Sequence, residues 1–259
     1  MQFHRRTNDT PLAAGFVHCR FFMPHIGTMC ETSLHSQLKL LYAGLDGHTE
    51  VEVAGFVADG MSADGCYVEV QTGSFAKLRK KAKKLAALGG LKIIYPVAVV
   101  KYLEVYDAEG KQEYRRKSGR PGSVWDLFSA LVYAPELPMI PGIEIELALV
   151  EVAEERIRDG KGSWWRKGLS VRDRRMLALC ERICLKKPGD YLRFVPFAKG
   201  EEFTAGTFAK KARIRVRLAN RALHTLVSLG ILERTGKLRN AYVYRLLVGS
   251  KTKKWKKQP

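Results

Sequence analysis

A short apolar stretch interrupted by one glutamate, residues 68–71, constrains this chain more than any other part of its sequence. Its two valines predict a buried strand, because residues two apart lie on the same face of a strand. The same rule places Glu69 and Gln71 together on the opposite face, where the strand ends. Six lysine and arginine residues lie between positions 77 and 84, and they predict a basic helix over residues 75–88.

A second predicted strand, residues 52–59, precedes this one, and the Asp-Gly pair at residues 64 and 65 is typical of a hairpin turn. A three-residue loop with Gly65 at positive φ places Asp59 opposite Glu69, whereas a two-residue loop pairs Asp59 with Val70. In the first register two carboxylates and the amide oxygen of Gln71 converge. Carboxylates that close repel each other unless a cation lies between them. Hard oxygen ligands with open positions suit Mg²⁺ or Mn²⁺.

An acidic residue, a hairpin, and Glu-x-Gln or Glu-x-Lys at a strand end that leads into a helix resemble the PD-(D/E)xK nuclease superfamily. This superfamily includes restriction endonucleases and archaeal Holliday-junction resolvases, and the resemblance covers residues 28–155. It implies an α/β fold with a mixed sheet flanked by helices, and metal-assisted hydrolysis of phosphodiesters. By the resemblance, Asp59 and Glu69 are the metal-binding carboxylates, Glu31 on a first helix completes the metal site, and Gln71 occupies the position of the motif's lysine.

The chain departs from the superfamily pattern at two points. No proline precedes Asp59, and Gln71 carries no positive charge. We expect Lys77 or Lys80 on the next helix to supply that charge, and Arg79, Lys81 and Lys84 to face DNA. An inactivated nuclease is the alternative. The expected catalytic set is therefore Glu31, Asp59, Glu69, Gln71, Lys77 and Lys80.

The net charge of +19 is unevenly distributed along the chain. Residues 1–155 hold 17 Lys and Arg against 19 Asp and Glu, whereas residues 156–259 hold 28 against 7. Such a surplus indicates a polyanionic partner, with nucleic acid first and an acidic membrane second. No apolar run approaches the ~20 residues that a membrane span needs. Five scattered cysteines in a chain of 259 residues indicate reduced thiols and a cytoplasmic, nucleoid-associated protein.

The C-terminal part, residues 170–248, shows a distinct order of predicted elements. Ser170 is expected to cap a first helix, Thr204 opens a short one, and residues 215–229 form a longer one. The segments 230–234 and 241–246 then form a two-stranded wing around residues 235–240. This order resembles winged helix-turn-helix domains, and the resemblance makes the helix over 215–229 the recognition helix. The side chains expected to reach DNA from this part are Arg213, Arg215, Arg217, Asn220, Arg221, His224, Lys237 and Arg239.

The predicted organisation is a loose tail (1–25), a nuclease-like domain (26–155), a linker (156–169), the winged helix (170–248) and a basic tail (249–259). Met23 or Met29 is a candidate natural start. Trp164 and Trp165 in the linker are expected to fill a domain interface, with stacking on a base as the alternative.

These observations predict a DNA endonuclease that depends on Mg²⁺ or Mn²⁺ and acts on duplex or branched DNA, with a homodimer as the preferred assembly. Repair, recombination, defence and mobile-element maintenance are equally compatible settings. Two rivals remain. One is a DNA-binding regulator or replication factor whose first domain is a catalytically silent nuclease fold. The other is an RNA-processing nuclease.

Overall fold

The computed structural model of this chain describes residues 32–44 and 48–247. A seven-stranded sheet has the order β1-β2-β3-β4-β6-β7, and β5 pairs with the second half of β4. β3, β4 and β6 run parallel, whereas the other neighbours are antiparallel. The strands are β1 (His48–Val53), β2 (Phe56–Met61), β3 (Tyr67–Val70), β4 (Leu91–Tyr106), β5 (Gln112–Lys117), β6 (Ile143–Arg158) and β7 (Leu169–Leu185).

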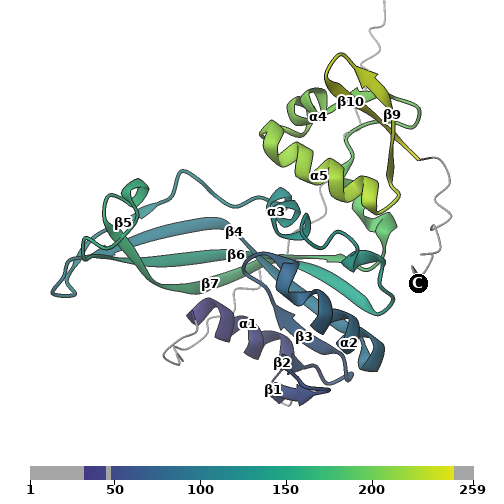
Figure 1. Cartoon of the computed structure of the whole chain (residues 1–259). Coiled ribbons are helices and arrows are strands. Elements are labelled where there is room, and N and C mark those ends of the chain that lie inside the picture. Colours follow the sequence, from purple (N-terminus) through teal and green to yellow (C-terminus); the bar gives the residue numbers. More distant parts are fainter. Residues whose placement is uncertain (1–31, 45–47, 248–259) are drawn as a thin grey trace, which may run out of the picture.

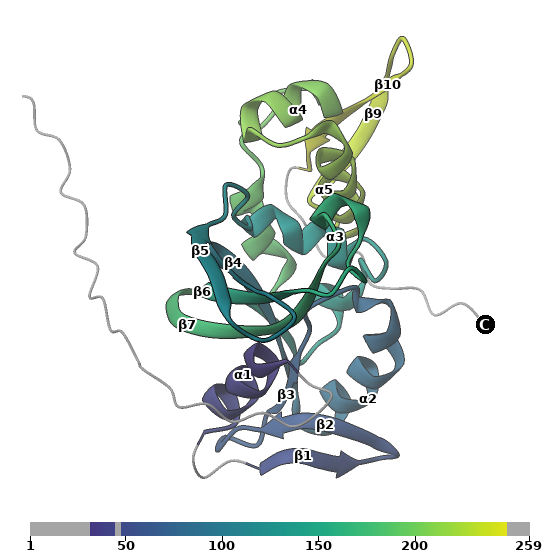
Figure 2. The ribbon, with the colours of Figure 1, turned by 90° about the vertical axis from the view of Figure 1, so that its left-hand side faces the viewer.

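Helices cover both faces of this sheet, so the expected mixed sheet flanked by helices is confirmed (Figure 1). α1 (Ser33–Ala43) packs Leu34 and Leu38 against the valines of β3 on one face. α2 (Arg79–Gly89) and α3 (Leu127–Leu131) pack on the other, and Figure 2 shows β3 between α1 and α2. Short 3-10 turns are η1 (Phe75–Leu78), η2 (Val124–Asp126), η3 (Leu137–Met139), η4 (Trp164–Arg166) and η5 (Pro188–Phe194).

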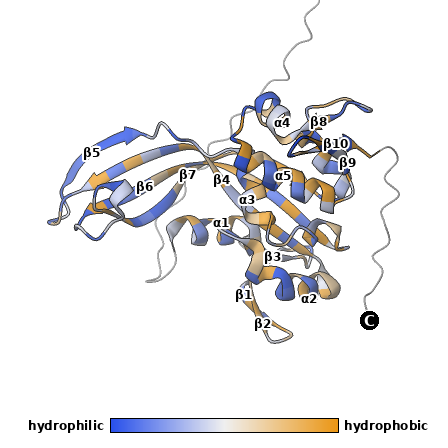
Figure 3. Ribbon diagram, turned by 45° about the horizontal axis from the view of Figure 1, so that its top comes forward, coloured by the Kyte–Doolittle hydropathy of each residue, from blue (hydrophilic) through white to orange (hydrophobic). Residues whose placement is uncertain are grey.

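The second halves of β4 and β6, the first half of β7 and the whole of β5 form a long projection (Figure 1). We call this projection the arm. The strands have 16, 16 and 17 residues, about three times the usual length. Figure 3 colours most of β5 as hydrophilic. Ion pairs accompany buried apolar residues here: Glu104 contacts Arg115 and Arg175, and Glu154 contacts Arg156 and Arg174.

The C-terminal part contains β8 (Phe203–Thr204), α4 (Ala205–Ala212), α5 (Val216–Ser228), β9 (Leu232–Leu238) and β10 (Ala241–Leu246). The strands form an antiparallel sheet in the order β8-β10-β9. Thr204 caps α4 through a capping box with Thr207, as the sequence predicts for the start of this helix. The core of this part is continuous with that of the main sheet, since Trp125 of η2 contacts both Phe194 and Phe208.

The prediction for residues 156–185 is wrong. The expected linker is the end of β6 followed by a loop, and the expected helix from Ser170 is strand β7, paired with β6 from Leu169 to Leu185. The apolar residues of this segment fit a helical period, but in the structure Asp173 turns inward to the start of α1. Irregularities in the β6–β7 register also break the alternation by which a strand is recognised.

Trp164 and Trp165 do not fill a domain interface, which corrects a second expectation. They lie in the loop between β6 and β7, with 78% and 85% of their surfaces exposed. The predictions for Glu31 and for the two tails fall outside the described residues.

Candidate functional site

The hairpin between β2 and β3 adopts the register of the three-residue loop. Gly60 pairs with Val68 and Met61 with Tyr67, and the Ser62 amide donates to the carbonyl of Cys66 at 2.9 Å. Gly65 has φ +80°, a conformation that side chains disfavour. Continued by one pair, this register brings Asp59 to Glu69.

The Asp59 carboxylate lies between the two strands at the point where the hairpin pairing ends. The amide of Val70 donates to its Oδ2 at 2.8 Å. From α1, His35 Nε2 lies 3.3 Å from the same oxygen, and Lys39 Nζ lies 3.6 Å from Oδ1. Burial alone would raise the pKa of Asp59, but the hydrogen bonds from His35 and Val70 and the nearby positive charges lower it overall.

Glu69 lies on the α2 side of the same site and is 5% exposed. Its Oε2 lies 2.5 Å from Lys81 Nζ, and its Oε1 accepts a hydrogen bond from Gln71 Nε2 at 3.4 Å. Burial and the negative charge of Asp59 raise the pKa of Glu69, although Lys81 opposes the shift. Asp59 and Glu69 therefore act on each other electrostatically, and burial weakens the screening between them.

The donor set suits a hard cation that also binds substrate. Mg²⁺ is often held by one or two carboxylates together with water and phosphate oxygens, rather than by a complete protein cage. Asp59 and Glu69 supply such a pair. Over residues 32–44 and 48–247, no group of three or more His, Cys, Asp or Glu side chains is arranged to hold a metal ion. Any metal here would thus rest on two carboxylates of the described chain.

The cationic residues that the sequence predicts for this site differ in their contacts. Lys77 and Lys80 are exposed, and the lysines that reach Asp59 and Glu69 are Lys39 and Lys81 instead. Arg79 is instead paired with Glu136 at 2.5 Å. Lys81, expected on DNA, is the residue that reaches Glu69, while Lys84 is exposed.

Neither Lys39 nor His35 is among the residues predicted from the sequence for this site. His35 Nε2 lies 3.0 Å from the Val70 carbonyl as well as against Asp59, so this side chain bridges α1 and the end of β3. Residues 35 and 39 are four apart and share one face of α1, next to the buried Leu34 and Leu38. Lys81 likewise lies three residues from Leu78 and four from Leu85, both buried. The available sequence signal for these residues was a cationic side chain next to the buried positions of a predicted helix.

A second surface gathers exposed polar and basic side chains on α4 and α5. Its described members are Lys210, Arg213, Arg215, Arg217, Asn220 and His224. Arg221 does not join them, because its Nη1 donates to Ser129 Oγ of α3 at 2.9 Å. The prediction that Arg221 faces DNA is therefore not supported by its position. This residue ties α5 to the main sheet layer.

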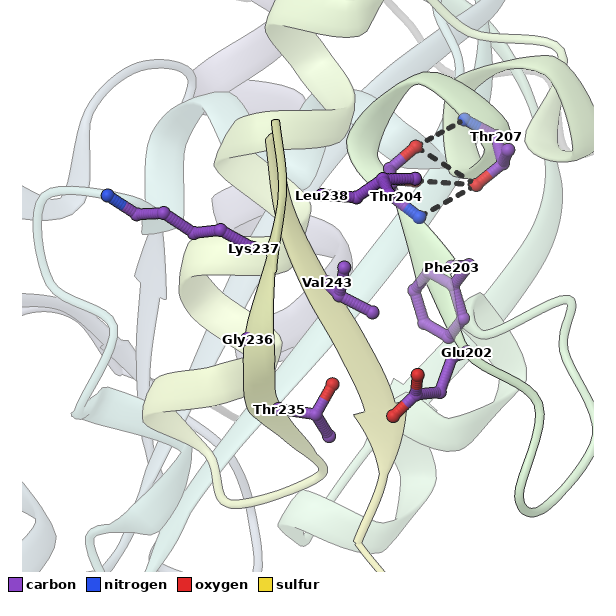
Figure 4. A pocket seen from close by; sticks show the side chains of 9 residues that line it. All are labelled: Glu202, Phe203, Thr204, Thr207, Thr235, Gly236, Lys237, Leu238 and Val243. Atoms are coloured by element: carbon purple, nitrogen blue, oxygen red, sulfur yellow. Dashed lines mark hydrogen bonds between the residues drawn. The ribbon is translucent and has the colours of Figure 1, made fainter. Parts of the chain in front are cut away.

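The β9–β10 hairpin extends this basic surface. Lys237 and Arg239 are exposed near its tip, and Arg234 and Lys237 both lie over the ring of Tyr242, at 4.6 and 4.9 Å from its centroid. Between the hairpin and the start of α4 lies a cavity (Figure 4). Its lining residues are Glu202, Phe203, Thr204, Thr207, Thr235, Gly236, Lys237, Leu238 and Val243.

None of the helices in the described part of the chain is both long and apolar enough to cross a membrane.

A family model described as "Domain of unknown function (DUF8091)" matches residues 32–186, from the start of α1 to the end of β7. An uncharacterized protein of Treponema pallidum (strain Nichols) is 28% identical over 152 residues, which are 59% of this chain and 61% of that protein. The chain thus spans less than two thirds of the length of this relative. No solved structure matches the chain.

Proposed function

We propose that this chain, which belongs to the DUF8091 family, is a metal-dependent endonuclease that hydrolyses phosphodiester bonds in DNA. The observation that carries the proposal is the approach of two carboxylates, Asp59 and Glu69, at the end of β3. Burying one acid beside another is unfavourable, and perturbed acids of this kind are concentrated at functional sites. The mixed sheet flanked by helices, with this pair at a strand end, is what the resemblance to the PD-(D/E)xK superfamily implies.

Each residue of the site has a role in this proposal. Asp59 and Glu69 would hold the metal. His35 positions Asp59 through its contacts with both Asp59 and Val70. A bound Mg²⁺ supplies charge stabilisation on the phosphate and a nucleophilic water at neutral pH.

Gln71 and Lys81 together take the place of the lysine in the motif. Gln71 lies just past the end of β3 and donates to Oε1 of Glu69, which holds the carboxylate in one orientation. Lys81 places its charge at Glu69 from α2. We infer that Lys81, rather than Lys77 or Lys80, stabilises negative charge on the phosphate.

The C-terminal part holds the DNA in this proposal. A short helix, a turn, a second helix and a two-stranded hairpin follow one another there, as in winged helix-turn-helix domains. The exposed Arg213, Arg217 and His224 lie on or next to α5. These side chains, with Lys237 and Arg239 of the hairpin, would contact DNA.

A catalytically silent fold in a DNA-binding regulator is the second candidate, and one observation favours it. Both carboxylates are already paired with lysines, Asp59 with Lys39 and Glu69 with Lys81. Their charges are therefore balanced without a metal. This candidate requires binding of DNA with no cleavage.

Cleavage of labelled single-stranded, duplex, flap and four-way-junction DNA, and of RNA, with Mg²⁺ or Mn²⁺ tests the proposal. We expect cleavage of DNA that stops with EDTA or with Glu69→Gln. Glu52→Gln is the matched control, because Glu52 is exposed on β1 of the same hairpin region. Tight DNA binding without cleavage would establish the silent fold instead, and cleavage of RNA alone would establish an RNA nuclease.

A further inference from the structure

Two neighbouring tryptophans lie at the end of the arm, in the connection between β6 and β7. Trp164 and Trp165 in the β6–β7 loop are 78% and 85% exposed, and their rings contact each other edge to face with centroids 4.5 Å apart. A soluble protein rarely exposes two adjacent side chains of this size, because each leaves a large apolar surface in water. An edge-to-face pair leaves ring faces open for a third flat group.

The loop that carries these rings is built by its own hydrogen bonds. The amide of Arg166 donates to Ser163 at 2.8 Å, and Arg166 Nε donates to the Leu169 carbonyl at 3.1 Å. The Gly162 amide donates to Gly168 at 3.0 Å. None of these bonds uses an indole ring, so the backbone presents both tryptophans without their help. A partner that stacks on them does not have to order the loop first.

The charge around the tryptophans favours an anionic partner. Lys161, Arg166 and Lys167 lie in the loop, and its one acid, Asp159, is engaged by the Lys161 amide and the Ser170 hydroxyl. A flat group that also carries negative charge matches this surface. An unpaired nucleotide has both features, and bases stack on exposed aromatic rings beside basic side chains in proteins that bind single strands.

The loop lies within reach of the carboxylate site. Asp173 of β7 accepts hydrogen bonds from Ser33 at the start of α1, and His35 of the same turn contacts Asp59. From Asp173 to Leu169 the strand rises about 13 Å, at roughly 3.3 Å per residue.

We propose that Trp164 and Trp165 are a stacking platform for an unpaired strand, so that the substrate is DNA with a single-stranded segment joined to a duplex. This inference rests on the proposed function, because it assigns the substrate class of the same site. The duplex binds the C-terminal basic surface, and the unpaired strand passes from the carboxylates along the arm to the loop.

Binding of the full chain in EDTA tests the platform without cleavage. The probes are a blunt duplex and the same duplex with a single-stranded overhang. The paired substitutions Trp164→Ala and Trp165→Ala are expected to weaken binding of the overhang probe at least about fivefold, the low end of one stacked base, and to leave the blunt probe unchanged. Changing both residues to Phe retains most of the preference. Tyr133→Ala, at another exposed aromatic residue, retains all of it.

Other results overturn the proposal. Equal affinity of the alanine variant and the unchanged protein for the overhang probe would do so, as would an equal loss on both probes. Tryptophan-dependent binding to phosphatidylserine vesicles, with DNA binding unaffected, would assign the loop to a membrane surface. If overhang binding depends on the tryptophans but no DNA is cleaved with Mg²⁺ or Mn²⁺, the nuclease proposal fails while the platform stands.

Discussion

Lys81 on α2 places its Nζ 2.5 Å from Oε2 of Glu69 on β3. On the other side of the site, Lys39 of α1 lies 3.6 Å from Asp59. Each helix that flanks β3 therefore brings one cation to one of two neighbouring carboxylates. This arrangement keeps both acids close together in a buried place, and it makes Lys81 the residue on which the charge of Glu69 depends.

We predict that Lys81→Met moves the acid limb of the pH–activity profile to higher pH. Burial and the charge of Asp59 raise the pKa of Glu69, and Lys81 is the group that opposes them. Without Lys81 the pKa of Glu69 rises further, so Glu69 stays protonated, and unable to bind metal, up to a higher pH. The measurement is the rate of Mg²⁺-dependent DNA cleavage as a function of pH.

Lys80→Met is the matched control for this prediction, because Lys80 is the exposed neighbour on the same helix. Its acid limb is expected to coincide with that of the unchanged protein. An acid limb that does not move in Lys81→Met would contradict the role given to this lysine.

The hairpin could be predicted from the sequence because its signals are local. The Asp-Gly pair and the length of the loop fix which residues face each other, and the register of Gly60 with Val68 confirms them. Lys39 and Lys81 could not be assigned in this way. Which of several cationic residues on a helix faces a strand depends on the rotation with which the helix packs on the sheet. That rotation cannot be predicted from one sequence.

Strand β7 was missed for a related reason. A strand is recognised from alternating apolar and polar residues, but β7 turns Asp173 and Arg175 inward to partners far away in the sequence. Because those partners, Ser33 and Glu104, are polar, the inward positions of β7 hold polar residues as well. The remaining apolar residues then fit a helical spacing by chance.

We predict opposite effects on stability when either carboxylate is neutralised. The pKa of Asp59 in the folded protein is below its ordinary value of 3.8. Its contribution is therefore fully present above about pH 3.8 and is lost as the pH falls through the folded pKa. Asp59→Asn is expected to lower the free energy of unfolding by about 1–2 kcal/mol at pH 7, and by less at pH 3. Urea unfolding at the two pH values measures this difference.

For Glu69 the expected effect of neutralisation on the free energy of unfolding has the opposite sign. Its pKa is above 4.5 in the folded protein, so the ionised side chain opposes folding at pH values above its folded pKa. Glu69→Gln is expected to unfold at a temperature no lower than the unchanged protein at pH 8, while cleavage is lost. A clear fall in the unfolding temperature would mean that Glu69 serves the fold rather than the site.

The arm should depend on its buried carboxylates. Glu154 is 2% exposed and lies in contact with Lys101, Arg156 and Arg174. Glu154→Ala leaves these cations without their partner and is expected to lower the free energy of unfolding by about 3 kcal/mol. Glu113→Ala, which breaks an exposed pair with Arg158, is expected to leave the free energy of unfolding nearly unchanged. Equal losses in the two variants would contradict the role given to burial.

We predict that two arginines of α5 differ in their effect on DNA binding. Arg217 is exposed, whereas Arg221 donates to Ser129 and joins α5 to α3. Arg217→Ala is expected to weaken duplex binding and to reduce the slope of log K against log salt by about 0.9, the contribution of one phosphate contact on duplex DNA. Arg221→Ala is expected to lower the unfolding temperature and to leave that slope unchanged. Arg217 and Arg221 lie about one helical turn apart on the same side of α5, so the contrast tests whether the exposed arginine, rather than the one bound to α3, contacts the DNA. Identical salt slopes for both variants would remove α5 from the DNA-binding surface.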